Sequence, residues 1–235
     1  MKASNIEKDI IFEDNQIIVC NKEEGVLSQA DSTSDLDILT LLKDYLKVKY
    51  NKPGNVYLGL VHRLDKRVSG VMVFGKTSKA SSRLSSDIRD KNFEKIYLAI
   101  VLGKVTKGDR IVTNIKKEGL IAKVDDNGKE SILEYEPLDY LTINNKEFTL
   151  LKVRLETGRF NQIRMQLASI NHPIINDFKY GYKDNKSNDF VPLGLYCVKL
   201  SFNHPVTKER LSFFMNKSLF KYNEYVDLER IYETL

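Results

Sequence analysis

Apolar residues occur in short runs along most of the chain, and in several runs they alternate with polar residues as β-strands require. The longest such run spans residues 93–105 and is apolar at both odd and even positions. We therefore expect it to be a strand that is covered on both faces. Further strands are predicted at residues 17–20, 56–61, 71–74, 132–141, 148–157, 195–202 and 211–214.

Three segments carry apolar residues at spacings of three and four, which predicts amphipathic helices. The first spans residues 34–50, with Ser34 or Asp35 as its N-cap. The second follows Thr77, and the third spans residues 159–170. The third helix would bury one face and leave a second, polar face, made of Arg159, Gln162 and Gln166.

Strands outnumber helices in this pattern. Residues 132–141 and 148–157 are separated by Asn144 and Asn145, a pair that favours a tight hairpin turn. The predicted fold class is therefore α+β, a mixed, largely antiparallel sheet core with flanking helices. A chain of 235 residues with 42% hydrophobic residues can form one domain, so we expect a single domain over residues 1–235.

Composition bears on whether the protein can bind RNA or a metal ion or span a membrane. Lys and Arg number 37 against 32 Asp and Glu, and a net charge of +5 permits RNA binding without requiring it. Cys20 and Cys197 stand alone, and His62, His172 and His204 form no metal-binding pattern with them. We therefore expect no metal site, and reduced thiols in a cytoplasmic protein. No apolar run is long enough to span a membrane.

A dense set of charges lies between two predicted strands. This polar hexamer reads His-Arg-Leu-Asp-Lys-Arg and occupies residues 62–67, where a simple turn would need far less charge. Two further segments stand out in order along the chain: KIYLAIVLG at residues 95–103 and TGRFNQIR at residues 157–164. Each alone is weak, but their joint occurrence in this order is specific.

These three segments resemble the motifs of the RluA family of pseudouridine synthases. The family's central motif reads His-Arg-Leu-Asp, two variable positions, then Thr-Ser-Gly, and its third motif reads Gly-Arg-Thr-His-Gln-Ile-Arg. Weaker similarities at residues 21–25, 172–181 and 204–207 extend the resemblance over nearly the whole chain. The departures that concern substrate contacts are Val68 for Thr, Asn161 for His, Glu23 for Pro and Asn176 for Gly.

The resemblance implies the pseudouridine synthase catalytic fold and an isomerase that converts specific uridines of ribosomal or transfer RNA to pseudouridine. The reaction moves the ribose from nitrogen 1 to carbon 5 of the same base, so it needs neither a metal nor a cofactor. Asp65 inherits the catalytic role, either as nucleophile at the anomeric carbon or as base at the 2′ position. The resemblance also implies a monomer without a separate N-terminal RNA-binding domain.

Roles for other residues follow from the same resemblance. Arg164 would pair with Asp65, and Tyr97 would stack on the target base while its hydroxyl helps to move the proton from carbon 5. Ile163 would close the apolar side of the base pocket, and Arg63 would fill the gap left by the extruded uridine. Further substrate contacts are expected from His62, Leu64, Arg159 and Gln162.

Each residue also has an ordinary structural explanation. Asp65 could form only a turn, Tyr97 could be core packing, Arg164 could be a surface charge, and His62 could be a structural histidine. Two alternative functions stay open at this point. One is a catalytically inactive RNA-binding or ribosome-assembly protein of the same fold. The other is a nucleoside or glycoside hydrolase with Asp177 as its second carboxylate.

Overall fold

The chain folds into two compact units, which are described separately. The computed structural model describes residues 3–33, 35–183 and 191–235. Unit 1 consists of Met1–Glu94 and Cys197–Leu219, and unit 2 consists of Lys95–Tyr196 and Phe220–Leu235. The chain thus leaves unit 1, builds most of unit 2 and then returns. The prediction of one catalytic domain stays a prediction.

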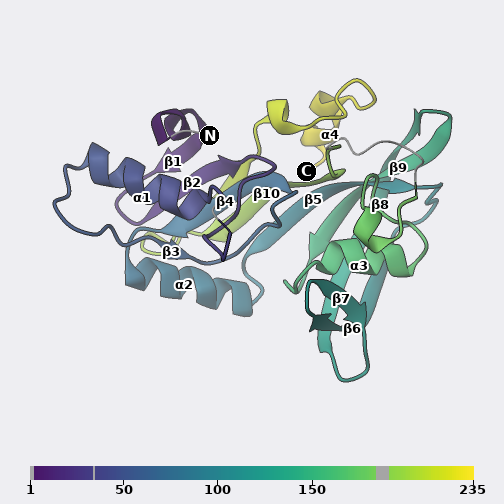
Figure 1. The fold of residues 1–235 in the computed structure, drawn as a ribbon, viewed down its shortest axis with the longest axis horizontal. Coiled ribbons are helices and arrows are strands. Elements are labelled where there is room, and N and C mark those ends of the chain that lie inside the picture. Colours follow the sequence, from purple (N-terminus) through teal and green to yellow (C-terminus); the bar gives the residue numbers. More distant parts are fainter. Residues whose placement is uncertain (1–2, 34, 184–190) are drawn as a thin grey trace. The chain divides into compact units, whose positions relative to one another are not determined.

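Unit 1 is built on strands that run in the order β1-β2-β4-β10, with β11 paired to β10 and β3 paired to β4 (Figure 1). The pairings β1–β2, β2–β4, β3–β4 and β10–β11 are all antiparallel. Every residue of β2 and β4 is buried, so both faces of these strands are covered. The strands of this unit are β1 Ile10–Glu13, β2 Ile17–Lys22, β3 Gly59–Leu60, β4 Ser69–Gly75, β10 Leu195–Asn203 and β11 Arg210–Phe214.

Two α-helices, α1 (Ile38–Lys49) and α2 (Ser78–Arg89), accompany these strands, and α2 packs against β3 and β4. The helix predicted after Thr77 is confirmed, and the Thr77 side chain caps it by accepting a hydrogen bond from the Ala80 N–H at 3.0 Å. Two 3₁₀ helices, η1 Ala3–Asp9 and η3 Lys217–Leu219, complete the unit.

The predicted start of the first helix is wrong. Helix α1 begins at Ile38, because extended Asp37 accepts the Thr40 N–H at 2.9 Å and so acts as the N-cap. The side chain of Asp35 instead accepts from Thr33 and Lys66. Ser34 lies outside the described residues.

The predicted strand at residues 56–61 is also largely wrong, since only Gly59–Leu60 pairs with β4. The chain leaves the sheet after Leu60. At the next position of β4, the Val73 N–H donates to Nε2 of the His62 side chain at 3.2 Å. A side chain therefore satisfies a backbone donor that a longer strand could have used.

Unit 2 contains an antiparallel sheet in the order β5-β9-β8-β6-β7. Seven consecutive residues of β5, 95–101, are buried, so the prediction of a strand covered on both faces is confirmed. Tight pairing of β8 with β9 confirms the predicted hairpin. The strands are β5 Glu94–Leu102, β6 Asp109–Glu118, β7 Ile121–Val124, β8 Lys129–Ile143 and β9 Lys146–Leu155, and the helices are α3 Gln162–Ser169, η2 Phe178–Tyr180 and α4 Leu228–Glu233.

Strands β1, β6 and β7 were not predicted. In β6 only Ile111 and Ile115 are buried, and these two are four residues apart, so the strand shows no run of strict alternation. Among the described residues, none of the helices combines the length and the hydropathy that a membrane span requires. The observed architecture confirms the α+β class with a largely antiparallel sheet.

Helix α3 is shorter than predicted and lacks the expected polar face. It starts at Gln162 because Asn161 adopts a left-handed conformation with φ of 51°. Gln162 and Gln166 are buried, and each donates from Nε2 to a backbone carbonyl of β8, Ile132 O at 3.1 Å and Ser131 O at 2.9 Å. Their polarity is thus used inside the unit rather than in solvent.

Candidate active site

The predicted catalytic loop, residues 62–68, lies between β3 and β4 of unit 1 and is held by side chains of the N-terminal segment. Ser28 Oγ accepts a hydrogen bond from the Leu64 N–H at 2.9 Å and donates to the Leu64 carbonyl at 2.7 Å. Leu64 is buried, at 6% exposure. Both backbone groups of the residue before Asp65 are therefore fixed.

Asp65 forms a local turn. Its Oδ1 accepts the Arg67 N–H at 2.9 Å, and its carbonyl accepts the Val68 N–H at 3.0 Å. The side chain is half-buried. Asp65 is thus a turn residue, and this turn also restricts the direction of its carboxylate.

Lys22 is a completely buried lysine beside this loop, and no pattern in the sequence predicted a role for it. Its Nζ donates to the carbonyls of Glu23 at 3.0 Å, Val26 at 2.8 Å and Lys66 at 3.4 Å. Burial lowers the pKa of Lys22 to about 7, although the carboxylate of Asp65 opposes this shift. The lysine therefore ties the segment after β2 to the loop and brings a titratable amine near Asp65.

His62 and Arg63 differ in their surroundings. His62 Nε2 accepts the Val73 N–H, so this nitrogen carries no proton, and the imidazole centroid lies 5.7 Å from that of Phe93. These contacts give His62 a structural role within unit 1. Arg63 is exposed, so its guanidinium is accessible to solvent.

In unit 2, Arg164 forms a buried bidentate ion pair with Asp177. Nε donates to Oδ2 at 2.7 Å and Nη2 donates to Oδ1 at 2.6 Å, with the side chains 5% and 0% exposed. The alternative that Arg164 is a surface charge is therefore wrong. Both oxygens of Asp177 accept from Arg164, which argues against the use of this carboxylate to activate water in a hydrolase.

Tyr97 and Ile163 are both buried in unit 2. Tyr97 lies on β5 opposite Val153 of β9 and is 6% exposed, and Ile163 lies on α3 and is 4% exposed. Their burial suits an apolar pocket and equally suits core packing.

Gln162 organises the turn before α3. Its Oε1 accepts from the Thr157 hydroxyl at 2.9 Å and from the Arg159 N–H at 3.0 Å. Arg159 itself is exposed and donates from Nε to the Glu130 carbonyl at 3.2 Å. Gln162 thus acts on the fold, whereas the charge of Arg159 faces solvent.

The predicted site residues therefore fall into two groups. Unit 1 holds His62, Arg63, Leu64 and Asp65 on one loop. Unit 2 holds Tyr97, Arg159, Gln162, Ile163 and Arg164 on β5, on α3 and in the turn before it. The predicted pairing of Arg164 with Asp65 joins residues of different units and stays a prediction.

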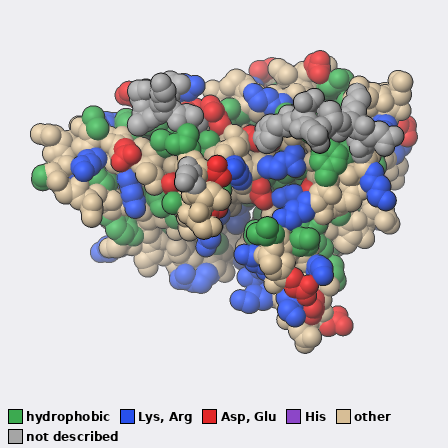
Figure 2. Space-filling view, viewed as in Figure 1, with side chains coloured by type: hydrophobic (Ala, Val, Ile, Leu, Met, Phe, Trp, Pro, Cys, Tyr) green, Lys and Arg blue, Asp and Glu red, His purple; other side chains and the backbone are tan. Residues whose placement is uncertain are grey.

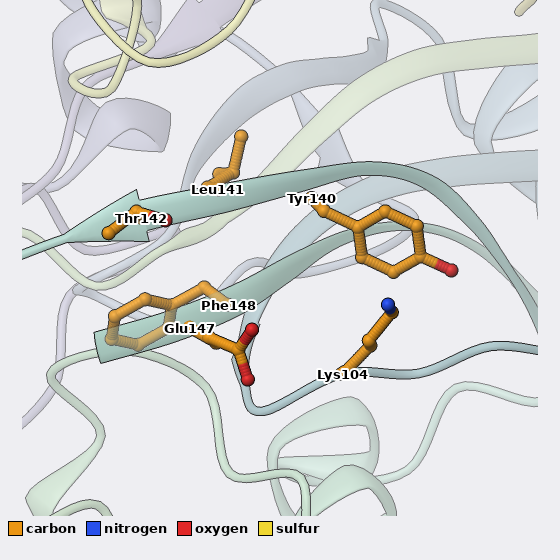
Figure 3. Close-up of a pocket in the computed structure, with 6 residues that line it drawn as sticks. All are labelled: Lys104, Tyr140, Leu141, Thr142, Glu147 and Phe148. Atoms are coloured by element: carbon orange, nitrogen blue, oxygen red, sulfur yellow. The ribbon is translucent and has the colours of Figure 1, made fainter. Parts of the chain in front are cut away.

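A small pocket in unit 2 lies outside this set (Figure 3). It measures about 120 Å³, and the Lys104 ammonium points toward the Tyr140 ring, 5.2 Å from its centroid. Ligand pockets usually measure about 300 Å³ or more. None of the predicted site residues lines this pocket, so it is not a candidate for the base-binding site.

Charges of both signs are interspersed on the face seen in Figure 2, with more basic than acidic side chains. This agrees with a net charge of +5 that is not concentrated in one tail. Within the described ranges, no group of three or more His, Cys, Asp or Glu side chains could hold a metal ion.

Comparison with known proteins gives consistent matches. A family model described as RNA pseudouridylate synthase matches residues 16–169. Ribosomal large subunit pseudouridine synthase D of Vibrio cholerae is 32% identical over 227 residues, which cover 90% of this chain and 68% of the relative. An uncharacterized RNA pseudouridine synthase of Aquifex aeolicus is 34% identical over 224 residues, which cover 91% of this chain and 70% of the relative.

A solved structure supports the fold independently. Human RNA Pseudouridylate Synthase Domain Containing 1 matches with a TM-score of 0.75 and 18% identity, covering 100% of this chain and 96% of that chain. The predicted catalytic fold is thereby confirmed.

Proposed function

The chain belongs to the RNA pseudouridylate synthase family and is an RNA pseudouridine synthase, an isomerase, and from this premise we propose that it modifies ribosomal RNA with Asp65 as its catalytic carboxylate. The similarity to an enzyme named for the large ribosomal subunit supports ribosomal over transfer RNA. The resemblance of residues 62–70 to the family's central motif supports Asp65.

The fixed position of Asp65 is the observation that carries the assignment. Its loop is bound by Ser28 through Leu64, by Lys22 through Lys66, and by its own turn to Arg67. A carboxylate held in this way loses little conformational freedom when substrate binds. A turn alone would not require a buried lysine beside it.

The proposed reaction breaks the bond between C1′ of the ribose and N1 of uracil. Asp65 acts either as nucleophile at C1′ or as base at the 2′ position. The base then rotates and C5 bonds to C1′ as the bond between C1′ and Asp65 breaks or, in the other route, as the 2′ position regains its proton. The C5 proton leaves and N1 gains a proton. Atoms balance without an external reactant, because uridine and pseudouridine are isomers.

Unit 2 would contribute the base pocket and a guanidinium. Tyr97 is assigned to stack on uracil and to assist proton transfer from C5, and Ile163 to line the apolar side. Arg164 is assigned to pair with Asp65, and Asp177 accepts from Nε and Nη2 of its guanidinium. Arg63, exposed on the loop, is assigned to replace the extruded uridine in the RNA.

The test is tritium release from ribosomal RNA labelled at C5 of uridine and taken from cells that lack this gene. Wild type is expected to release tritium, and Asp65→Asn to be slower by at least ~10³-fold. Asn suits this test because its Oδ1 can still accept the Arg67 N–H and so preserve the turn. The matched control, Asp44→Asn on the exposed face of α1, should retain wild-type activity.

Three other outcomes would contradict the proposal. Release from labelled transfer RNA but not from ribosomal RNA would contradict the substrate. No release by the wild type, with RNA still bound, would favour the inactive RNA-binding protein. Free uracil among the products would favour a hydrolase.

A further inference from the structure

A partly exposed aromatic ring, Phe160, lies in unit 2 beside two lysines. It is 40% exposed, and Nζ of Lys117 and Nζ of Lys179 lie 4.7 Å and 6.0 Å from its centroid. In the family motif given above, this position is Thr. Both lysines are themselves exposed, so a ligand can displace them from the ring without unfolding any element.

The ring sits on a rigid support. The Tyr180 hydroxyl accepts from the Ala122 N–H at 2.8 Å and from Asn161 Nδ2 at 3.1 Å. It thereby joins β7, η2 and the turn that carries Phe160. Beneath this junction, Tyr180 packs in a buried cluster with Ile115, Ala122 and Met165. The turn that carries the ring is thus held by contacts from β7 and η2.

The two lysines carry available charge. Their neighbours on β6 and β7 are paired: Lys116 lies 3.6 Å from Asp125, and Lys123 lies 2.8 Å from Glu118. Among the residues that the structure describes, no carboxylate lies within ion-pair distance of Lys117 or Lys179. Figure 2 shows hydrophobic, basic and acidic side chains together over the part of unit 2 that Figure 1 labels α3, β6 and β7.

We propose that Phe160, Lys117 and Lys179 form a stacking platform for an unpaired nucleotide of the RNA substrate. The Phe160 ring stacks on the base, and the ammonium groups contact the phosphates on either side. Such a combination of aromatic ring and cations is how proteins bind single-stranded nucleic acid, whereas a duplex would hide the faces of its bases. This inference rests on the proposed RNA substrate.

The platform is coupled to the assigned site through Tyr180. The Arg164 guanidinium carbon lies 5.0 Å from the centroid of the Tyr180 ring, whose hydroxyl binds Asn161, the residue after Phe160. The bound nucleotide is therefore one that flanks the target uridine, rather than the target itself. The platform would contribute to the choice of site in the RNA.

The experiment measures binding of a short fluorescein-labelled single-stranded oligouridylate by fluorescence anisotropy. Phe160→Ala is expected to raise Kd by about 5- to 100-fold, the range that removal of one stacked base implies. Phe160→Trp should retain or improve binding. The double variant Lys117→Gln, Lys179→Gln should reduce the slope of log Kd against log salt by about 1.4.

Matched controls come from the same unit. Tyr140 is 51% exposed and also has a lysine, Lys104, over its ring, but its hydroxyl donates to the Val105 carbonyl at 3.2 Å. Tyr140→Ala and Lys123→Gln should leave Kd unchanged. Equal losses in Tyr140→Ala and Phe160→Ala, or no loss in Phe160→Ala, would overturn the platform.

The experiments distinguish an error in the platform proposal from an error in the proposed function. Asp65→Asn is expected to abolish tritium release while binding the oligouridylate as the wild type does. If wild type releases tritium from ribosomal RNA but Phe160→Ala binds and reacts normally, only the platform is wrong. If wild type releases none and Phe160→Ala still loses affinity, the platform stands and the substrate assignment falls.

Discussion

Arg164 and Asp177 illustrate how a single pair of residues shapes unit 2. Both charges are taken out of water, which costs free energy, and two short hydrogen bonds in a planar arrangement offset that cost. Removing one partner would leave the other buried without its main counter-charge. The net contribution of the pair to stability is therefore smaller than the destabilisation that follows when one partner is removed and the other charge stays buried.

Asp177→Ala is accordingly expected to lower the free energy of unfolding by about 3–5 kcal/mol. Urea unfolding followed by circular dichroism measures this. The control is Asp139→Ala, whose partner Arg230 lies 2.5 Å away with side chains 55% and 33% exposed. That exposed pair should change stability by less than about 1 kcal/mol. Equal effects of the two variants would contradict the buried-pair argument.

Lys22 is a second buried charged residue whose burial depends on its hydrogen-bond partners. A lysine at the end of an apolar run suggests a residue that turns back to solvent. Instead the amine stays inside and donates to backbone carbonyls. The pKa of about 7 that burial imposes makes its charge sensitive to pH in the physiological range, next to the assigned catalytic carboxylate.

Among the elements, the β8–β9 hairpin owes its geometry to its turn. Asn144 and Asn145 have φ values of 50° and 60°, as the two central residues of a type I′ turn require. Asn tolerates this left-handed conformation better than most residues. The turn fixes the register of strands that pair from Ile143 with Lys146 to Leu133 with Leu155.

Replacing Asn145 with a β-branched residue should strain this turn. Asn145→Val is expected to cost about 1–2 kcal/mol of stability, and Asn145→Gly to be neutral or stabilising. Thermal unfolding of the three proteins tests this. Thr142→Val, at an exposed strand position three residues away, controls for added hydrophobic surface. A stable Asn145→Val variant would show that the turn does not depend on its backbone conformation.

Helix α3 owes its position to side-chain hydrogen bonds as well as to packing. Gln162 and Gln166 bind carbonyls of β8, and the Tyr180 hydroxyl joins the turn before α3 to β7. The helix that carries Ile163 and Arg164 is thereby attached to the sheet through its first residue, Gln162, and again one turn later through Gln166. Precise placement of α3 is what a site built on it requires.

At the scale of the whole chain, an ionic network closes the N-terminal part of unit 1. Glu13 of β1 accepts from Lys49 at 2.8 Å, from Tyr50 at 2.7 Å, and from Lys76 at 2.7 Å. Burial raises the pKa of Glu13, but these hydrogen bonds outweigh burial and lower it to about 2. The network thus joins segments from three parts of the sequence.

This shift makes unfolding depend on pH in a defined window. Because the pKa of Glu13 is lower in the folded than in the unfolded chain, its stabilisation is complete above pH 4.5 and is lost as pH falls toward 2. Glu13→Gln should lower stability by about 2 kcal/mol at pH 7, a value reduced because Lys49 is exposed. The difference from wild type should shrink between pH 4.5 and 2.

Urea unfolding over a pH series measures that difference. Glu7→Gln, at an exposed position of η1, is the control and should run parallel to wild type at every pH. A difference between Glu13→Gln and wild type that does not change with pH would contradict the role assigned to the network.

Local sequence patterns were sufficient to predict much of the secondary structure and the fold class of this protein. The covered strand β5, the helix after Thr77, the hairpin at Asn144 and the α+β class all followed from the sequence. Alternation, capping and left-handed turns depend on residues close together in the chain. The ordered motifs around Asp65 and Arg164 likewise identified the family, because they concern which residues are present and in what order.

Tertiary structure decided which polar groups are buried and with what partner. Nothing near Lys22, Gln166 or Arg164 in the sequence predicts a wholly buried amine, a buried amide or a bidentate partner at Asp177. The early end of β3 was equally hidden, because the His62 side chain takes a backbone donor of β4. Burial and partnership depend on segments far apart in the chain, and only packing brings those segments together.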